Sequence, residues 1–318
     1  MAIFGTGGVG GYLGARLAEA GQEVVLIARG AHLEAIRRHG LRLESIAGDA
    51  EVRPALATDD PAEAGPADSV IVATKTWQLR EAARALGPMV GPETTVLPVL
   101  NGVEAADVLA EALGRERVLG GLCGMISFLV GPGRIRHTGA DPWVTFGELA
   151  GSMTERVRRL EETLRRCRGL RVEATTEIHV ALWEKFAFIT ATGGVGAVTR
   201  APMGAFRSVP ESRRLLEDAM REVVEVARAR GVSIRDEVVA ERMRLVDGLE
   251  PHGTSSMQRD ILAGRRSELE EWNGAVVRLG REAGVETPAH ASMYAALLPQ
   301  ELRARGELSF PEAPGTAS

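Results

Sequence analysis

The first residues of the chain, MAIFGTGGVGGYLGARLAEAG (residues 1–21), decide the fold. A short apolar segment is followed by Gly5-x-Gly7-x-x-Gly10 and by a helical pattern that ends at Gly21. In a strand–turn–helix unit of this kind, the first glycine forms a tight turn, the second lets the backbone approach a pyrophosphate, and the third lets the helix pack against the strand. The unpaired backbone amide groups at the start of the helix carry a partial positive charge, which favours the binding of a phosphate there. The stretch predicts a dinucleotide-binding loop made of Gly5, Thr6, Gly7, Gly8, Val9 and Gly10.

Residues 23–28 are expected to form a second strand, at the distance that a βαβ unit requires. A carboxylate at the end of this strand would bind the ribose 2′-hydroxyl of NAD, whereas the 2′-phosphate of NADP needs a cation. Here the strand VVLIAR ends in Arg29, no acidic residue occupies that position, and Arg37 and Arg38 follow on the next helix. The pattern favours NADP(H) as the cofactor; the alternative is that Arg29 is an ordinary surface residue.

Alternating strand and helix patterns continue as far as about residue 173. They predict strands at 68–75, 94–102, 117–123, 126–130 and 143–147 and an arginine-rich helix at about 152–168. Helical patterns alone follow, at about 176–192, 210–230, 236–247, 267–283 and 288–298. We therefore expect an α/β chain with a Rossmann-type dinucleotide-binding domain at 1–173 and an all-helical substrate and catalytic domain at 174–318. The tail from about residue 308 is expected to be disordered.

Composition restricts the class of protein. The 318 residues are 45% apolar and 25% charged, with a net charge of −5, so neither nucleic acid nor a membrane surface is expected as a partner. Cys123 and Cys167 have no metal-ligand spacing, so we expect no disulfide framework and no metal. No run approaches the ~20 apolar residues of a membrane span, and the early glycine motif leaves no room for a signal peptide. These features predict a cytoplasmic protein that binds a small molecule and leave a homodimer open.

The segment LWEKFAFITATGG (residues 182–194) predicts a buried helix that carries a lysine. Residues at i, i+3, i+4 and i+7 share a face, so Leu182, Lys185, Phe186 and Ile189 form a stripe that is apolar except at Lys185. One explanation is that the lysine lays its stem on apolar surface and keeps its ammonium in water. The other is an ammonium at the wall of a cleft, placed to give a proton to a substrate or to bind its charge.

Polar residues at two strand ends and near two helix starts are further candidates. Lys75 and Asn101 follow predicted parallel strands, whose carboxyl ends usually face the ligand. Ser255 and Ser256 precede a helical turn, and Ser267-x-x-Glu270 has the form of a capping box that would make Glu268 the first residue of a helix. Loop structure and helix capping also explain these residues without any function.

Together these segments resemble the ketopantoate reductase (2-dehydropantoate 2-reductase) family, which uses NADPH to reduce ketopantoate to pantoate on the route to pantothenate and coenzyme A. The resemblance covers nearly the whole chain. It rests on the order and spacing of the glycine motif, the arginine after the second strand, TK-x-W-Q (Lys75, Trp77, Gln78), NG at Asn101, W-x-K at Lys185, SSM-x-x-D at residues 255–260 and E-x-x-x-x-N-G from Glu268.

The resemblance implies a role for each matching residue. Lys185 would be the general acid, Asn101 would lie at the nicotinamide and the substrate, and Lys75 would lie near the cofactor and the active site. Ser256, with Ser255 beside it, would bind the substrate carboxylate. Glu268 would bind the substrate hydroxyl or pair with Lys185.

This sequence also departs from the best-known family members. They carry asparagines four and eight residues after the lysine, where this chain has Ile189 and Gly193. A pocket that lacks such hydrogen-bond partners can accept different substrates. Two hypotheses stay open. One is an NADPH-dependent reductase of ketopantoate or of another branched 2-oxo acid; the other is a non-catalytic NADP-binding sensor. The presence of Lys185, Ser256 and Glu268 favours the enzyme, because a sensor needs no proton donor.

Overall fold

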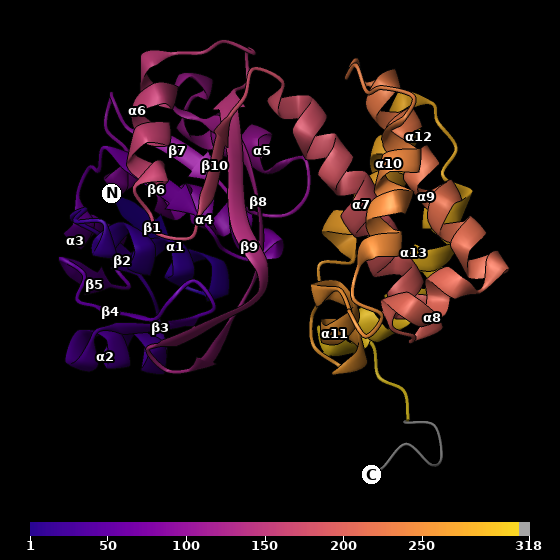
Figure 1. Cartoon of the computed structure of the whole chain (residues 1–318), viewed down its shortest axis with the longest axis horizontal. Helices are drawn as coiled ribbons and strands as arrows, with labels where there is room; N and C mark the ends of the chain where they lie inside the picture. The colour runs from indigo at the N-terminus through magenta and orange to yellow at the C-terminus, as the bar shows by residue number, and fades with distance from the viewer. Residues whose placement is uncertain (312–318) are drawn as a thin grey trace. The chain divides into compact units, whose positions relative to one another are not determined.

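The computed structural model describes residues 1–311, which form two compact units (Figure 1). The first unit spans Met1–Leu182 and the second begins at Trp183. The domain boundary expected from the sequence, after residue 173, lies nine residues before the division between the two units. The helix that follows residue 173, Ile178–Thr199, begins in the first unit and continues into the second. Its residues Ile178 and Leu182 cluster with Leu122 of the first unit.

The tail that was expected to be disordered, from about residue 308, lies partly within the described residues and partly outside them. Within the described part, the Leu308 amide donates to the Leu302 carbonyl (3.3 Å), and the Arg303 guanidinium lies 5.1 Å from the centroid of the Phe310 ring. Residues 312–318 lie outside the described residues, so disorder there stays a prediction.

The first unit contains a five-stranded parallel sheet in the order β5-β2-β1-β6-β7. Its strands are β1 (Ala2–Phe4), β2 (Val25–Ile27), β5 (Leu56–Thr58), β6 (Ser69–Val72) and β7 (Thr95–Pro98). Its helices are α1 (Gly8–Glu19), α2 (Gly30–His39), α3 (Pro61–Ala64), α4 (Leu79–Ala85) and α5 (Ala105–Leu113). The central strands are largely buried and almost wholly apolar, as expected for a parallel sheet covered on both faces. This order confirms the Rossmann-type unit predicted from the glycine motif.

A second sheet has the order β10-β9-β3-β4, with β8 paired to β9. It consists of β3 (Leu41–Ser45), β4 (Ala50–Val52), the long strands β8 (Leu119–Gly131) and β9 (Arg134–Glu148), and β10 (Arg171–Ala174), with α6 (Glu155–Arg165) before the last strand (Figure 1). The strand segments expected at 117–123 and 126–130 form one long strand, β8, which begins at Leu119. The register on β9 shifts between Gly124 and Ile126. That irregularity interrupts the alternation from which strands are predicted.

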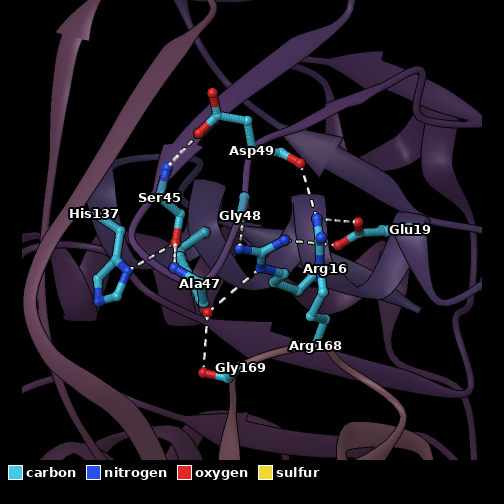
Figure 2. Close-up of polar contacts among 10 residues, drawn as sticks. Arg16, Glu19, Ser45, Ala47, Gly48, Asp49, His137, Arg168 and Gly169 are labelled. Carbon is cyan, nitrogen blue, oxygen red and sulfur yellow. Dashed lines mark hydrogen bonds and ion pairs between the residues drawn. The ribbon is translucent and has the colours of Figure 1, made fainter.

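A buried arginine on α1 joins the two sheets of this unit (Figure 2). The Arg16 side chain is 0% exposed; it donates to Glu19 (2.7 Å), to the Gly48 carbonyl between β3 and β4 (2.6 Å) and to the Tyr12 hydroxyl (3.4 Å). Tyr12 in turn donates to the Gly169 carbonyl, just before β10 (3.3 Å). One face of α1 is thereby fixed to the second sheet.

The second unit is helical throughout its described part, which confirms the predicted class. It contains most of α7 (Ile178–Thr199), then α8 (Met203–Ser208), α9 (Pro210–Ala229), α10 (Val238–Gly248), α11 (Ser256–Leu262), a π-helical turn η4 (Glu270–Gly274), α12 (Ala275–Ala283) and α13 (Pro288–Ala304). The single helix expected at 267–283 is therefore a π-helical turn followed by α12. Within residues 1–311, none of the helices has the length and apolar character that crossing a bilayer requires.

A buried polar chain fixes α7 among its neighbours. Glu222 on α9 accepts hydrogen bonds from the backbone amides of Ala289 (2.6 Å) and His290 (3.0 Å) and from His290 Nδ1 (2.7 Å). His290 Nε2 lies 3.2 Å from the Thr190 hydroxyl on α7. Because buried polar groups are costly unless paired, this chain selects one arrangement of α7, α9 and α13.

Replacing Arg16 tests its part in holding the first unit together. Arg16→Leu is expected to lower the free energy of unfolding by about 2–4 kcal/mol, because three acceptors, of which Glu19 and Gly48 are only partly buried, lose a charged donor. Arg168 is the matched control, since it also binds Glu19 (2.5 Å) but its side chain is 51% exposed; Arg168→Leu should cost less than about 1 kcal/mol. Urea unfolding followed by circular dichroism measures both, and equal losses would contradict this explanation.

Candidate functional site

The loop after β1 is crowded on one side and open on the other. Gly5 has a φ of +98°, which side chains rarely adopt. A Cβ at Gly10 would lie 2.1 Å from the Gly5 carbonyl oxygen, so only glycine lets α1 approach the loop this closely. A Cβ at Gly7 would meet no atom within 4 Å. The three glycines thus have the conformations expected of a loop that admits a pyrophosphate at its second glycine.

The start of α1 suits a negatively charged group. Gly7 is its N-cap, no side chain caps this helix end, and the first turn carries no acidic residue. The Thr6 hydroxyl donates to the Ile27 carbonyl (2.9 Å), which ties the loop to the end of β2. A Cβ at Gly8 would lie 2.1 Å from the Ser127 carbonyl oxygen, so β8 passes close to the helix start. These features fit the phosphates of a dinucleotide.

The other candidates of the first unit lie at the same edge of the sheet. Arg29, Lys75 and Asn101 follow β2, β6 and β7, whose carboxyl ends lie at the same edge of the parallel sheet as that of β1. A Cβ at Gly5 would lie 2.9 Å from Thr74 Cγ2, so the loop after β1 touches the loop after β6. This edge is where open α/β sheets bind their ligands.

Lys75 is exposed, and its ammonium lies 5.3 Å from the centroid of the Trp77 ring. Such a cation–π contact restrains the long side chain near the strand end. Asn101 is half-buried, and Gly102 after it has a φ of +97°, which explains why the turn needs a glycine there.

Arg29 has an acidic neighbour that the sequence did not reveal. Its guanidinium lies 3.3 Å from the Glu81 carboxylate on α4, and the two side chains are 64% and 69% exposed. No acidic residue stands at the strand end itself, but Glu81 reaches Arg29 from a distant segment of the chain. An ion pair this exposed contributes little stability, so a phosphate can replace the carboxylate.

The two arginines that follow on α2 have other partners. Arg37 donates to the Ala57 carbonyl (2.9 Å), and Arg38 lies 4.0 Å from Glu34. Both stand in the last turn of α2, roughly 10 Å along the helix from its start. Arg29 is therefore the arginine of this group that stands at the strand end.

In the second unit, α7 presents Lys185 from a firmly held helix. Lys185 is half-buried, while Leu182 and Phe186 on the same face are buried. The preceding residue, Glu184, forms a largely buried ion pair with Arg242 on α10 (2.5 Å). The adjacent acid and base thus point to different surroundings, because successive helical residues are about 100° apart around the axis.

Glu268 is 5% exposed, but its surroundings differ from the predicted capping box. The Ser267 hydroxyl and amide both donate to Glu301 Oε2 on α13 (2.6 and 3.0 Å). The Glu270 carboxylate accepts from the Tyr294 hydroxyl (2.6 Å) instead of the Ser267 backbone. The capping box is therefore wrong, because α13 supplies tertiary partners to both residues. Glu268 is held between an anchored serine and a π-helical turn, a geometry that is frequent at functional sites.

Glu271 lies near Glu268 and was not singled out from the sequence. Burial raises the pKa of the Glu271 carboxyl, and the charge of Glu268 raises it further. Among the described residues, its Oε2 atom is buried without a hydrogen-bond partner. The Glu271 carboxyl therefore keeps its proton to a higher pH than a carboxyl in water does.

The two serines of SSM-x-x-D have different local positions. Ser255 is the N-cap of α11, and its hydroxyl accepts a hydrogen bond from the Gln258 amide (3.0 Å). Helix capping therefore accounts for this serine without a role in binding. Ser256 is the first residue of α11 and is half-buried. Substrate binding by either serine stays a prediction.

Side chains from other helical segments fill the space beside Gly193 on α7. A Cβ on Gly193 would lie 2.9 Å from Trp272 Cζ3, 3.1 Å from Trp272 Cε3 and 3.2 Å from the Met257 methyl carbon. The Trp272 ring therefore fills the space beside Gly193 that an asparagine side chain would occupy. The sequence gives one signal of this, a large aromatic residue four positions after Glu268.

Comparison with known proteins agrees with this architecture. Residues 1–151 match the family model described as ketopantoate reductase PanE/ApbA, and residues 177–301 match that of its C-terminal domain. YkpB of Bacillus subtilis, named an uncharacterized oxidoreductase, is 32% identical over 93% of this chain and 96% of its own. A 2-dehydropantoate 2-reductase of Halobacterium salinarum is 33% identical over 91% of this chain and 94% of its own.

A solved structure is also similar over nearly the full length. The PanE/ApbA family ketopantoate reductase from Ralstonia eutropha superposes with a TM-score of 0.87 at 33% identity, covering 96% of this chain and 99% of that one. Two adjoining family models and these full-length relatives lead to one conclusion: this chain belongs to the ketopantoate reductase family.

Proposed function

We propose that the protein is an NADPH-dependent reductase of a branched 2-oxo acid, with ketopantoate, reduced to pantoate for pantothenate and coenzyme A synthesis, as the first substrate to test. The observation that carries the proposal is the use of lysine. Of 38 Lys and Arg residues only Lys75 and Lys185 are lysines, and both stand at positions that match the family motifs. At Lys185 the chain has an ammonium where a proton would be transferred, a step that arginine could not perform because a guanidinium does not deprotonate in proteins.

The cofactor proposal rests on the edge of the first sheet. The loop Gly5–Gly10 and the start of α1 would hold the pyrophosphate, and Arg29 would bind the 2′-phosphate. Lys75 and Asn101 would lie along the same edge, toward the nicotinamide. Bound NADPH supplies the hydride, and the protein residues determine where the substrate carbonyl stands.

On the second unit, three residues would act on the substrate. Ser256 would bind its carboxylate. Lys185 would stabilise the negative charge that grows on the carbonyl oxygen and then give that oxygen a proton; the apolar stripe around it strengthens this attraction by lowering the local dielectric. Glu268 would orient Lys185 or the substrate hydroxyl. The hydrogen bonds from the neighbouring residue, Ser267, to Glu301 hold the backbone at Glu268 in position.

Another branched 2-oxo acid is the second candidate substrate, favoured by Ile189 on the lysine face of α7. We also propose a cytoplasmic location, because neither Cys123 nor Cys167 forms a disulfide in the described part of the chain and reducing compartments maintain such thiols. Burial raises the pKa of Cys167 to about 12, so neither metal binding nor catalysis is proposed for it.

Cofactor preference follows from Arg29. Arg29→Ala should raise the Kd for NADPH by about 10–100-fold, because a charged hydrogen bond to the 2′-phosphate is lost, and should leave the Kd for NADH nearly unchanged. Glu81→Gln is the matched control; it should leave NADPH binding within about threefold, because the exposed ion pair contributes little. Fluorescence titration measures each Kd, and a wild-type protein that binds NADH more tightly than NADPH would refute the proposal.

The catalytic role of Lys185 can be separated from its charge. Lys185→Arg and Lys185→Ala should both lower kcat by at least about 100-fold, because neither variant has an acid that can give up a proton. NADPH affinity should stay close to wild type in both. Glu268→Gln should cost less than Lys185→Ala, because glutamine keeps a hydrogen bond.

The assay follows NADPH absorbance with a panel of 2-oxo acids that includes ketopantoate. Wild-type turnover by Lys185→Arg would remove the lysine from the mechanism and support the view that it only lies on apolar surface. A wild-type protein that binds NADPH and reduces no acid of the panel would favour the non-catalytic sensor.

A further inference from the structure

The face of α7 that carries Lys185 continues into an apolar, largely buried cluster. Residues four and eight positions after the lysine, Ile189 and Gly193, lie on the same general face of the helix. Ile189 is half-buried and packs against a cluster that includes Met257, Leu269 and Trp272. The wall beyond the ammonium is therefore built from hydrocarbon and aromatic groups.

Gly193 and Trp272 form a coupled pair. The distance of 2.9 Å between a Cβ at Gly193 and Trp272 Cζ3 is shorter than real Cβ contacts, and Trp272 is 2% exposed, so its ring cannot swing aside into solvent. An asparagine at position 193 therefore requires a smaller residue at position 272. The tryptophan needs glycine opposite it for the same reason.

The apolar wall formed by Ile189, Met257 and Trp272 directly adjoins the residues proposed to bind the substrate. The Trp272 backbone amide donates to the Glu268 carbonyl (2.9 Å), so the ring and the carboxylate belong to one turn of chain. Met257 directly follows Ser256. A change in the wall therefore takes place immediately beside the groups that would hold the 2-oxo acid.

We infer that Trp272, together with Gly193 and Ile189, determines substrate specificity by replacing a hydrogen-bonding wall with an apolar one. The inference rests on the proposed reductase function and deepens it. A site that binds a substrate hydroxyl rejects the analogue without it by about 10⁴-fold or more, whereas an apolar site discriminates only about 100-fold between the two. The protein therefore reduces 2-oxo acids with branched hydrocarbon side chains about as well as their hydroxylated counterparts.

The first measurement compares two substrates of the wild-type protein. Trimethylpyruvate is ketopantoate without its hydroxyl group, so the ratio of their kcat/KM values reports recognition of that group alone. We expect the ratio to lie within about 100-fold of unity. A preference of about 1000-fold or more for ketopantoate would overturn the inference and leave the reductase function intact. Failure to reduce either acid would contradict both the specificity inference and the proposed reductase function.

Variants test whether Trp272 sets this ratio. The double variant Gly193→Asn with Trp272→Leu places an amide where the ring was and should shift the ratio toward ketopantoate by at least about tenfold. An unchanged ratio in a double variant that binds NADPH and melts as a folded protein would overturn the inference. Gly193→Asn alone should lower the melting temperature, because the ring occupies the space.

Trp272→Phe is the conservative control. The indole Nε1 atom is buried with no hydrogen-bond partner in the part of the chain that the structure describes. If the ring acts as an apolar filler, phenylalanine should leave the substrate ratio within about threefold of wild type. A loss of tenfold or more for ketopantoate alone would show that the indole N–H binds the hydroxyl, which contradicts an apolar wall.

Discussion

The close approach of α1 to the turn after β1 is the constraint on which the first unit depends. A Cβ at Gly10 would stand 2.1 Å from the Gly5 carbonyl oxygen, so no larger residue lets the helix start directly at the strand end. With the helix there, its uncapped amides face the open space at Gly7, and the strand order sets Arg29, Lys75 and Asn101 along the same edge. On its other face, the buried Arg16 prevents α1 from moving away from the second sheet. A single helix thus joins the carboxyl edge of the first sheet to the rest of the unit.

In the second unit, α7 has the corresponding importance. The ion pair of Glu184 with Arg242 and the bond between Thr190 and His290 hold it at two points on different sides. Rotation about the helix axis is therefore excluded, and Lys185 and Ile189 keep one direction. The chemistry of the proposed reaction then depends on what this fixed face presents, which is one ammonium followed by apolar groups.

Local chemistry explains which features could be predicted from the sequence. The glycine loop, the parallel strands and the helical second unit depend on backbone geometry and periodicity within short segments, so they could be predicted. The contacts at the candidate site that could not be predicted involve partners from distant segments. Glu301 is 34 residues from the serine that it binds, Glu81 reaches Arg29 from α4, and Trp272 fills the space at Gly193. Pattern within a short window carries no information about such contacts.

The most direct test of the proposed reaction follows one atom. Wild-type protein is incubated with ketopantoate and NADPH that carries deuterium on one face of the nicotinamide C4, each face in turn, and the product is analysed by mass spectrometry. Hydride transfer to the carbonyl carbon predicts pantoate with deuterium at C2 from one of the two cofactors and none from the other. Pantoate without deuterium from either cofactor, or no product at all, would contradict it.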